Sequence, residues 1–187
     1  MPKIPVLEIF GPTIQGEGSV IGRKTMFVRT SGCDYRCSWC DSSFTWDGSA
    51  KDDIRLLEPE QILSELDQLA PNQYQHVTIS GGNPALIKNI GPLVEAFKER
   101  NIQTALETQG SKFQEWMVDI DDLTISPKPP SSGMKPSLPI LDNVISKCTK
   151  ESLSLKVVIF DDEDYKFAKD IHARSPDIPF YLQVGNP

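Results

Sequence analysis

The chain has 187 residues and a formal net charge of −7, with 39% hydrophobic and 24% charged residues. This length predicts a single domain over residues 1–187, with enough chain for a substantial core. No run approaches the roughly 18 apolar residues of a membrane span, and the first apolar run is interrupted by Glu8 and too short for a signal peptide. Basic residues occur at most as isolated pairs, which argues against nucleic-acid binding. We therefore expect a cytoplasmic protein with small-molecule or protein partners.

Hydrophobic periodicity and turn residues predict strands that alternate with helices. Strands are expected over residues 25–30, 76–80, 102–108, 123–126, 153–160 and 178–184, with an added edge strand at 6–10. Helices are expected over residues 59–70, 87–100, 112–120, 138–148 and 163–174. Pro59 suits a first helical turn, and Asp161 with Asp162 can cap the last helix and complement its dipole.

This alternation predicts parallel strands joined by right-handed crossovers, with helices on the outside. A closed eight-stranded barrel takes roughly 250 residues, so the chain is too short for one. We expect an α/β fold with an open, partial TIM-like barrel of about six parallel strands and outer helices, and a flat doubly wound sheet is the alternative. In either fold the functional site lies beyond the carboxyl ends of the strands.

The loops that follow the expected strands carry mostly small and polar residues. They comprise residues 31–33, 80–84, 107–110, 126–128, 161–162 and 183–186. Any one of them is explained by ordinary turn chemistry. Because all of them meet at one face of the expected fold, together they indicate a polar site there.

The most informative residues are three cysteines within eight positions, Cys33, Cys37 and Cys40. This spacing is too tight for scattered core residues and indicates binding of a metal or a cluster. A structural zinc site needs four protein ligands, whereas a cluster held by three cysteines leaves one iron open to another ligand. Thioredoxin-like chemistry through Cys37 and Cys40 would leave Cys33 unexplained.

Zinc stays an alternative if Cys148, His76 or His172 supplies a distant fourth ligand. None of these three belongs to a second ligand pair of the kind that structural zinc sites use. The pattern therefore favours an iron-sulfur cluster. Cys148 is otherwise interpreted as a buried small residue near a helix end.

The Cys-x3-Cys-x2-Cys loop, with the aromatic Trp39 before its last cysteine, and the run 81–84 (Gly-Gly-Asn-Pro) resemble the radical S-adenosylmethionine (SAM) superfamily. The resemblance implies an abbreviated radical SAM fold with the cluster loop at 33–40. It implies that the three cysteines hold a 4Fe-4S cluster and that SAM chelates the fourth iron. Reductive cleavage of SAM would then give a 5'-deoxyadenosyl radical that abstracts hydrogen from substrate. The cofactor carries this chemistry, so no side-chain nucleophile is expected.

Further segments resemble the 7-carboxy-7-deazaguanine synthase family, namely residues 10–18, 27–29, 40–42, 106–110, 126–130 and 181–186. The family converts 6-carboxy-5,6,7,8-tetrahydropterin to 7-carboxy-7-deazaguanine with loss of ammonia, on the route to the modified tRNA base queuosine. The resemblance implies Mg2+ as a further cofactor, a flavodoxin-like electron donor and a homodimer. The alternatives within and outside enzymes are an activase of a glycyl-radical enzyme and a non-catalytic zinc-binding module.

The same resemblance assigns residues to the ligands. Substrate contacts are implied for Ile14, Gln15, Gly16, Arg29 and Ser80. SAM contacts are implied for Trp39, Cys40, Asp41, Gly82, Ser126, Pro127, Lys128, Gln183, Val184, Gly185 and Asn186. Ser42 is implied as the Mg2+ ligand, at a position where many relatives have Thr.

Physical chemistry leaves two of these assignments open. A buried Arg29 needs an anion, which is either the planar carboxylate of the substrate or an internal Glu or Asp. The Ser42 hydroxyl suits Mg2+, which prefers oxygen ligands, but it also suits a helix cap.

Two features depart from the family pattern. Asn83 stands where many superfamily members have a Glu that meets the ammonium of SAM, and an amide oxygen would accept that hydrogen bond more weakly. The chain ends at Pro187, where the family generally continues into a segment that helps to close the substrate pocket. We therefore expect a truncated form in which pocket closure is affected and the cluster loop is not.

Overall fold

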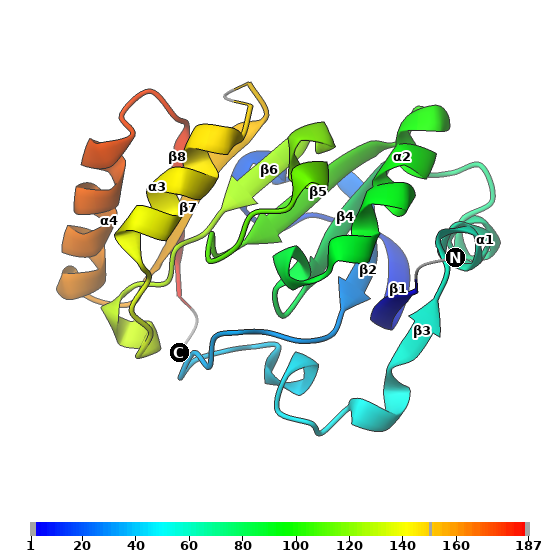
Figure 1. Cartoon of the computed structure of the whole chain (residues 1–187), viewed down its shortest axis with the longest axis horizontal. Helices are drawn as coiled ribbons and strands as arrows, with labels where there is room; N and C mark the ends of the chain where they lie inside the picture. The colour runs from blue at the N-terminus through cyan, green and yellow to red at the C-terminus, as the bar shows by residue number, and fades with distance from the viewer. Residues whose placement is uncertain (1–2, 150, 186–187) are drawn as a thin grey trace.

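The computed structural model describes residues 3–149 and 151–185, which contain one eight-stranded sheet (Figure 1). The strand order is β3-β1-β2-β4-β5-β6-β7-β8. The strands are β1 (Ile4–Ile14), β2 (Lys24–Thr30), β3 (Arg55–Leu57), β4 (His76–Gly81), β5 (Gln103–Thr108), β6 (Asp122–Ile125), β7 (Leu153–Ile159) and β8 (Phe180–Val184). From β2 to β8 all neighbours pair in parallel, and β1 pairs antiparallel with β2 and β3. Since β3 and β8 end the order and do not pair, the sheet is open, which confirms the partial barrel.

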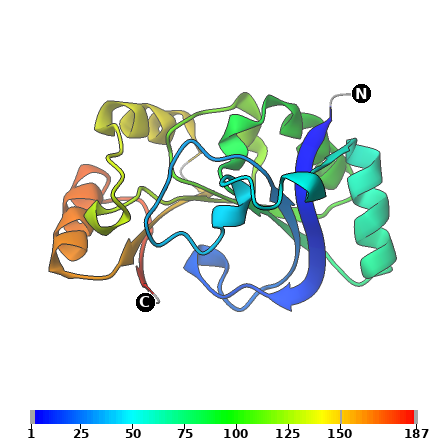
Figure 2. The same ribbon diagram turned by 90° about the horizontal axis from the view of Figure 1, so that it is seen from below.

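The four α-helices of the described residues are α1 (Pro59–Leu69), α2 (Gly91–Glu99), α3 (Leu138–Lys147) and α4 (Asp162–Arg174). Figure 2 shows them around the outer side of the curved sheet. Pro59 occupies the first turn of α1, and the Asp161 side chain accepts a hydrogen bond of 2.9 Å from the backbone N of Asp164 at the start of α4. Both local predictions from the sequence are therefore confirmed. In the part of the chain that the structure describes, no helix is long and apolar enough to cross a bilayer.

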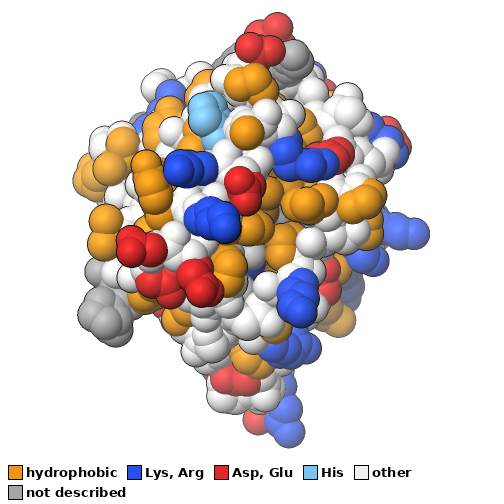
Figure 3. All heavy atoms as spheres, turned by 90° about the vertical axis from the view of Figure 1, so that its left-hand side faces the viewer, with side chains coloured by type: hydrophobic (Ala, Val, Ile, Leu, Met, Phe, Trp, Pro, Cys, Tyr) orange, Lys and Arg blue, Asp and Glu red, His pale blue; other side chains and the backbone are white. Residues whose placement is uncertain are grey.

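On the face formed by α3 and α4, Lys and Arg side chains are interspersed with Asp, Glu and hydrophobic side chains (Figure 3). Arg174 at the end of α4 forms an ion pair with Asp142 of α3. This contact joins the two helices at their exposed edge.

Two sequence predictions about elements were wrong. The strand predicted at the sheet edge, β1, lies one position inside it, because the three-residue strand β3 pairs with its outer side. The helix predicted over 112–120 is only a short 3-10 segment, Glu115–Asp119. Its buried side chains Trp116 and Met117 are adjacent, so they do not form the apolar stripe of an α-helix, and the preceding Gln114 side chain instead donates to the carbonyl of Ala85 (2.8 Å).

The parallel strands separate an apolar side from a polar side because successive side chains point to opposite faces. Val77 and Ile79 of β4 are fully buried in the core, whereas the alternate residues Thr78 and Ser80 line a cavity. In β7, Lys156 stands between the core residues Leu155 and Val157 and points to the polar side. The helices thus cover the hydrophobic side of the sheet, and the inner side of the open barrel is left for a site.

Candidate active site

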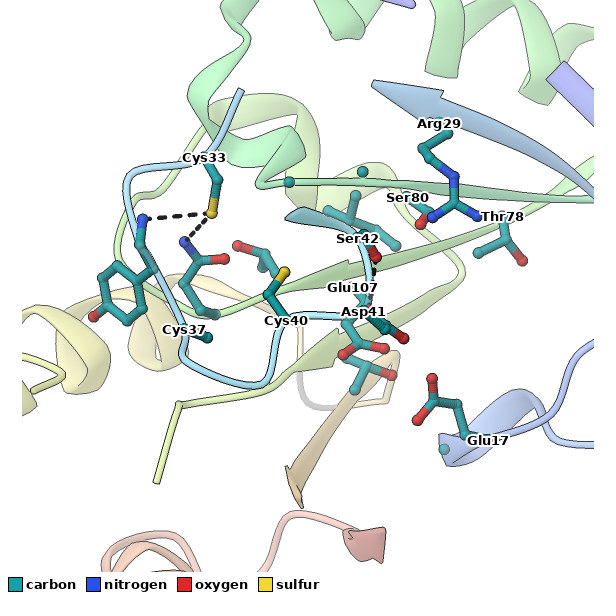
Figure 4. A pocket seen from close by; sticks show the side chains of 18 of the residues that line it. Glu17, Arg29, Cys33, Cys37, Cys40, Asp41, Ser42, Thr78, Ser80 and Glu107 are labelled. Carbon is teal, nitrogen blue, oxygen red and sulfur yellow. Dashed lines mark hydrogen bonds between the residues drawn. The ribbon is translucent and has the colours of Figure 1, made fainter. Parts of the chain in front are cut away.

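A cavity of about 280 Å³ lies at the carboxyl ends of the central parallel strands (Figure 4). Among the residues assigned from the sequence, its lining includes Gln15, Arg29, Cys33, Cys37, Trp39, Cys40, Asp41, Ser42, Ser80, Gly82 and Lys128. The lining of this cavity does not include Ile14, Gly16, Ser126, Pro127, Gln183, Val184 or Gly185. Asn186 lies outside the described residues. The structure therefore brings together around one space many of the residues that the family resemblance assigns to the cluster, SAM and substrate, whereas the strand ends at 126–127, 161–162 and 183–185 do not line this space.

Cys33, Cys37 and Cys40 all line this cavity as free thiols. Burial raises the pKa of Cys37 to about 11, although Lys128 opposes this shift. Burial also raises the pKa of Cys33, against the smaller effects of the Tyr35 backbone N–H and the Gln109 amide. The Cys33 and Cys37 thiols are therefore protonated at neutral pH until a metal displaces their protons.

The proposed fourth zinc ligands lie elsewhere. Cys148 is buried at the end of α3, where its thiol donates to the Val144 carbonyl (3.1 Å). His76 is buried at the amino end of β4 against Thr25, and His172 packs on Phe180 at 5.0 Å between ring centroids. Within the described ranges no three His, Cys, Asp or Glu side chains converge as ligands of a single ion. Three soft thiols around one open cavity fit a cluster that leaves one iron free.

The double glycine at the end of β4, Gly81 and Gly82, lets the cysteine loop pack against the sheet. A Cβ on Gly82 would lie 2.4 Å from the Gly32 carbonyl oxygen and 2.8 Å from Cys33 Cβ, and one on Gly81 would lie 2.2 Å from the Thr30 oxygen. The backbone N of Asn83 also donates to the Gly32 carbonyl (2.8 Å). Gly82 was expected to allow close approach of SAM to the backbone. In the structure, it is the backbone of the cysteine loop that comes this close and requires a glycine.

Gly82→Ala should destabilise the fold and loosen the cysteine loop, because the added methyl group collides with backbone that cannot easily move. Overpacking of this kind costs about 1–3 kcal/mol. Thermal unfolding and iron content after anaerobic reconstitution would measure the effect. Gly16→Ala is a matched control, since a Cβ there meets nothing within 4 Å. Equal melting temperatures and iron contents for the two variants would contradict this account.

The structure corrects the expected role of Asn83. Its side chain is fully buried and does not line the cavity. Its oxygen accepts from Thr108 Oγ1 (2.8 Å) and the Ala85 backbone N (3.2 Å), and its Nδ2 donates to Asp34 Oδ1 (2.9 Å) and Ser111 Oγ (3.0 Å). Because these partners use the whole amide, Asn83 holds the loops together and is not available to the ammonium of SAM.

Arg29 faces the cavity from β2, on the same strand face as Phe27 and in register with Ser80 (Figure 4). Its Nε lies 2.5 Å from Glu8 Oε1, but this ion pair does not have hydrogen-bond alignment. The guanidinium carbon lies 5.5 Å from the ring centroids of both Phe10 and Phe44. The sequence left open whether Arg29 pairs with the substrate carboxylate or with an internal Glu or Asp, and Glu8 is such an internal partner. Among the described residues the terminal nitrogens of Arg29 donate no hydrogen bond to Glu8, so they can still bind an anion in the cavity.

Ser42 precedes a short 3-10 turn, Ser43–Thr45, but its side chain makes no capping hydrogen bond. The hydroxyl instead donates to Asp41 Oδ1 (2.7 Å), and both residues line the cavity. The alternative of a helix cap is therefore excluded. Two oxygen-bearing side chains are left together at the cavity wall.

The cysteine loop is also fixed on its other side. The Ser38 backbone N donates to the Ser132 carbonyl (2.9 Å), and Trp39 Nε1 donates to Ser131 Oγ (2.9 Å). The Trp39 ring lies 5.1 Å from that of Phe160, and a Cβ on Gly185 would lie 2.4 Å from Phe160. Gly185 therefore packs behind the aromatic pair, although it does not line the cavity.

The acidic residues Glu17 and Glu107 line the cavity (Figure 4). They share the ammonium of Lys156, a combination absent from the sequence-based site. Lys156 Nζ lies 2.7 Å from Glu107 and 2.9 Å from Glu17, and its side chain is 2% exposed. Burial opposes the charge of Lys156, but the two carboxylates outweigh it and raise the pKa of Lys156. Burial likewise opposes ionisation of Glu107, but Lys156 and Lys128 lower its pKa below the usual range. In the sequence, the lysine inside the apolar run of β7 was the sign that could have indicated this charged group.

A sequence model of the radical SAM superfamily matches residues 27–126. A 7-carboxy-7-deazaguanine synthase of Bacillus cereus is 61% identical over 186 residues, covering 100% of this chain and 78% of the relative. The corresponding protein of Bacillus subtilis is 62% identical over 187 residues, covering 98% of this chain and 77% of the relative. The chain belongs to the 7-carboxy-7-deazaguanine synthase family. This confirms the resemblance, and membership of the radical SAM superfamily implies a 4Fe-4S cluster and SAM.

Solved structures agree on the fold of this family. The crystal structure of QueE from Escherichia coli matches with a TM-score of 0.79 and 23% identity, covering 98% of this chain and 85% of that chain. The structure of TYW1 with a lysine-pyruvate adduct matches with a TM-score of 0.60 and 16% identity, covering 87% and 65%. At these identities the likeness shows the fold alone.

Proposed function

We propose that the chain is a radical SAM lyase that converts 6-carboxy-5,6,7,8-tetrahydropterin to 7-carboxy-7-deazaguanine with loss of ammonia. The observation that carries this proposal is the shared cavity, in which the three cysteines and Arg29 face the same space. Relatives more than 60% identical bear the name of this synthase. A site with only the cysteines would support radical chemistry but would not indicate the substrate.

Cys33, Cys37 and Cys40 would hold the 4Fe-4S cluster through their thiolates. When bound, the cluster and SAM supply a carbon radical that takes a hydrogen atom from the substrate. Trp39, Gly82 and Lys128 line the cavity beside the cysteines and are the residues we assign to SAM, whereas the Asp41 carboxylate, which the family resemblance gives to SAM, is assigned to Mg2+ below. Ser126, Pro127 and residues 183–186 stay predictions for the same cofactor. The protein's part is to place substrate and SAM together and to exclude competing reactions.

Arg29 would bind the carboxylate of the pterin by a paired hydrogen bond from its planar guanidinium. The pyrimidine edge of the pterin carries N–H and amino donors, which need acceptors. Glu17 and Glu107 supply carboxylate acceptors, and Lys156 keeps Glu107 ionised by lowering its pKa. Gln15 lines the same cavity and can donate or accept. The cavity therefore offers a cation, Arg29, for the carboxylate of the substrate and two anions, Glu17 and Glu107, for the donors of its ring.

Ser42 and Asp41 would hold Mg2+ together with the substrate carboxylate and water. Mg2+ prefers oxygen ligands and keeps several waters, so two protein oxygens at the cavity wall suit it. The ion would orient the substrate during the rearrangement that follows hydrogen abstraction.

Ser42→Ala should raise the Mg2+ concentration needed for half-maximal product formation about tenfold, because one oxygen ligand is lost. Ser42→Thr keeps the hydroxyl and should stay near the original value. Product formation titrated with Mg2+ measures both variants, and the 5'-deoxyadenosine formed without substrate serves as the control for cluster function. The same Mg2+ requirement in Ser42→Ala and the unaltered protein would remove Ser42 from the proposed site.

The proposal is tested by anaerobic reconstitution, reduction, and incubation with SAM and the carboxypterin, with and without Mg2+. We expect 5'-deoxyadenosine, ammonia and the deazaguanine product. Absence of iron and sulfide would instead favour a zinc-binding module. Formation of 5'-deoxyadenosine without any pterin conversion would favour an activase of a glycyl-radical enzyme. The flavodoxin-like donor and the homodimer stay predictions, which reduction assays and sedimentation can test.

A further inference from the structure

Two side chains from outside the Cys-x3-Cys-x2-Cys segment donate N–H groups to two of its three sulfurs. Gln109 Nε2 lies 3.6 Å from Cys33 Sγ, and Trp46 Nε1 lies 3.5 Å from Cys40 Sγ. The Tyr35 backbone N also donates to Cys33 (3.4 Å). Among the residues the structure describes, no side-chain N–H donates to Cys37. The sulfurs therefore receive unequal hydrogen bonding.

Gln109 is held so that its second N–H can only point to sulfur. The residue is 4% exposed, and its Nε2 donates to Asp34 Oδ1 at 2.6 Å. Asn83 Nδ2 donates to the same oxygen at 2.9 Å, and Thr108 Oγ1 fixes Asn83 in turn. Since an amide nitrogen carries two hydrogens and the first is used by Asp34, the second is directed at Cys33.

Trp46 is held from the opposite side of the cysteine loop. The guanidinium of Arg36 lies 4.6 Å from the ring centroid of Trp46. The same guanidinium donates to the carbonyls of Cys33 (2.6 Å) and Tyr35 (2.7 Å). Arg36 thereby links the ring of Trp46 to the beginning of the cysteine loop, and the indole N–H faces Cys40.

Hydrogen bonds to cysteine sulfur are one of the means by which proteins set the reduction potential of an iron-sulfur cluster. Reduction adds a negative charge, part of which resides on the sulfurs, so an N–H dipole stabilises the reduced state more than the oxidised state. We propose that Gln109 and Trp46 are positioning residues that raise the reduction potential of the cluster, each through a different cysteine. The inference rests on the proposed cluster at Cys33, Cys37 and Cys40.

The test uses Gln109→Met and Trp46→Phe, which keep most of the side-chain volume and remove the N–H. The clusters are titrated anaerobically without SAM or substrate, and the reduced form is followed by electron paramagnetic resonance. At a fixed potential each variant should show a three- to tenfold lower ratio of reduced to oxidised cluster, which corresponds to a shift of about 30–60 mV to more negative potential. The potential shift of the double variant should be roughly the sum of the two single shifts, because the two donors contact different cysteines.

Gln114→Met and Trp116→Phe are matched controls. These side chains donate to backbone carbonyls, Gln114 to Ala85 (2.8 Å) and Trp116 to Ile87 (3.2 Å), and not to sulfur. Their clusters should titrate like the unaltered protein. Potentials of Gln109→Met and Trp46→Phe equal to these controls, with full iron content, would overturn the inference. Loss of iron from either variant would overturn it for that residue, whose role would then be to hold the loop. Failure of the unaltered protein to bind iron would refute the proposed function instead.

Discussion

Cys37→Ala is expected to lose the 4Fe-4S cluster and all cleavage of SAM. The three cysteines line one cavity that has no further Cys or His among its described lining residues, so no neighbouring thiol or imidazole can replace the lost ligand. Iron and sulfide analysis after reconstitution, the visible absorption of the cluster and the yield of 5'-deoxyadenosine measure the loss. Since Cys37 is only partly buried in a surface loop, the fold itself should persist.

Arg29→Ala is the contrasting variant, because Arg29 lines the same cavity but is proposed to bind the substrate and not the cluster. It should keep iron, sulfide and the slow cleavage of SAM without substrate. KM for the carboxypterin should rise about 10- to 100-fold, since a hydrogen bond between charged groups contributes about 1.5–3 kcal/mol. Loss of the cluster from both variants to the same extent would contradict the separation of radical generation from substrate binding.

Lys156→Met should lower both the free energy of unfolding and the affinity for substrate. The ammonium of Lys156 is the shared partner of Glu17 and Glu107, and its removal takes from both carboxylates the cation that pairs with them directly. Because both carboxylates face the cavity and keep some solvent, we expect a loss of about 1–3 kcal/mol, less than for a fully buried pair. Chemical denaturation at neutral pH measures this loss of unfolding free energy.

The pH dependence of the unfolding free energy shows whether the loss in Lys156→Met is electrostatic or a simple packing defect. Lys156 lowers the pKa of Glu107 below the ordinary value of 4.5 for a glutamate, so the stability gained from this pair is present above about pH 4.5 and is lost as the pH falls further. The difference in unfolding free energy between the unaltered protein and Lys156→Met should therefore shrink in acid. Lys98→Met is a control, because its ion pair with Asp119 is on the surface and should contribute little. A difference that stays constant from pH 7 to pH 4 would indicate packing alone.

The arrangement of strands could be predicted from the sequence because each parallel strand has a strong apolar pattern and polar residues at its end. The short strand β3 escaped prediction, since three residues carry no periodicity. Its pairing with β1 depends on contacts that only the folded chain provides.

The cysteine site could be predicted because its ligands are close in sequence, whereas contacts between distant loops could not. Glu107 and Gln109 were visible only as part of a polar strand end, and nothing local shows that one meets Lys156 and the other Cys33. Asn83 was expected to meet the cofactor from its position in a motif, but the direction of its side chain is set by Thr108 and Asp34. Residue type and spacing predict the chemistry of a site, and tertiary packing decides which atoms face it.

The way the cysteine loop is anchored bears on how much order the loop must gain when a cluster binds. Backbone hydrogen bonds fix the loop at both ends, from Asn83 N to the Gly32 carbonyl (2.8 Å) and from Ser38 N to the Ser132 carbonyl (2.9 Å), and neither involves a metal. Each contact reduces the conformational entropy that the loop has left to lose when a cluster binds. We therefore expect the folded apoprotein to accept iron and sulfide without first unfolding.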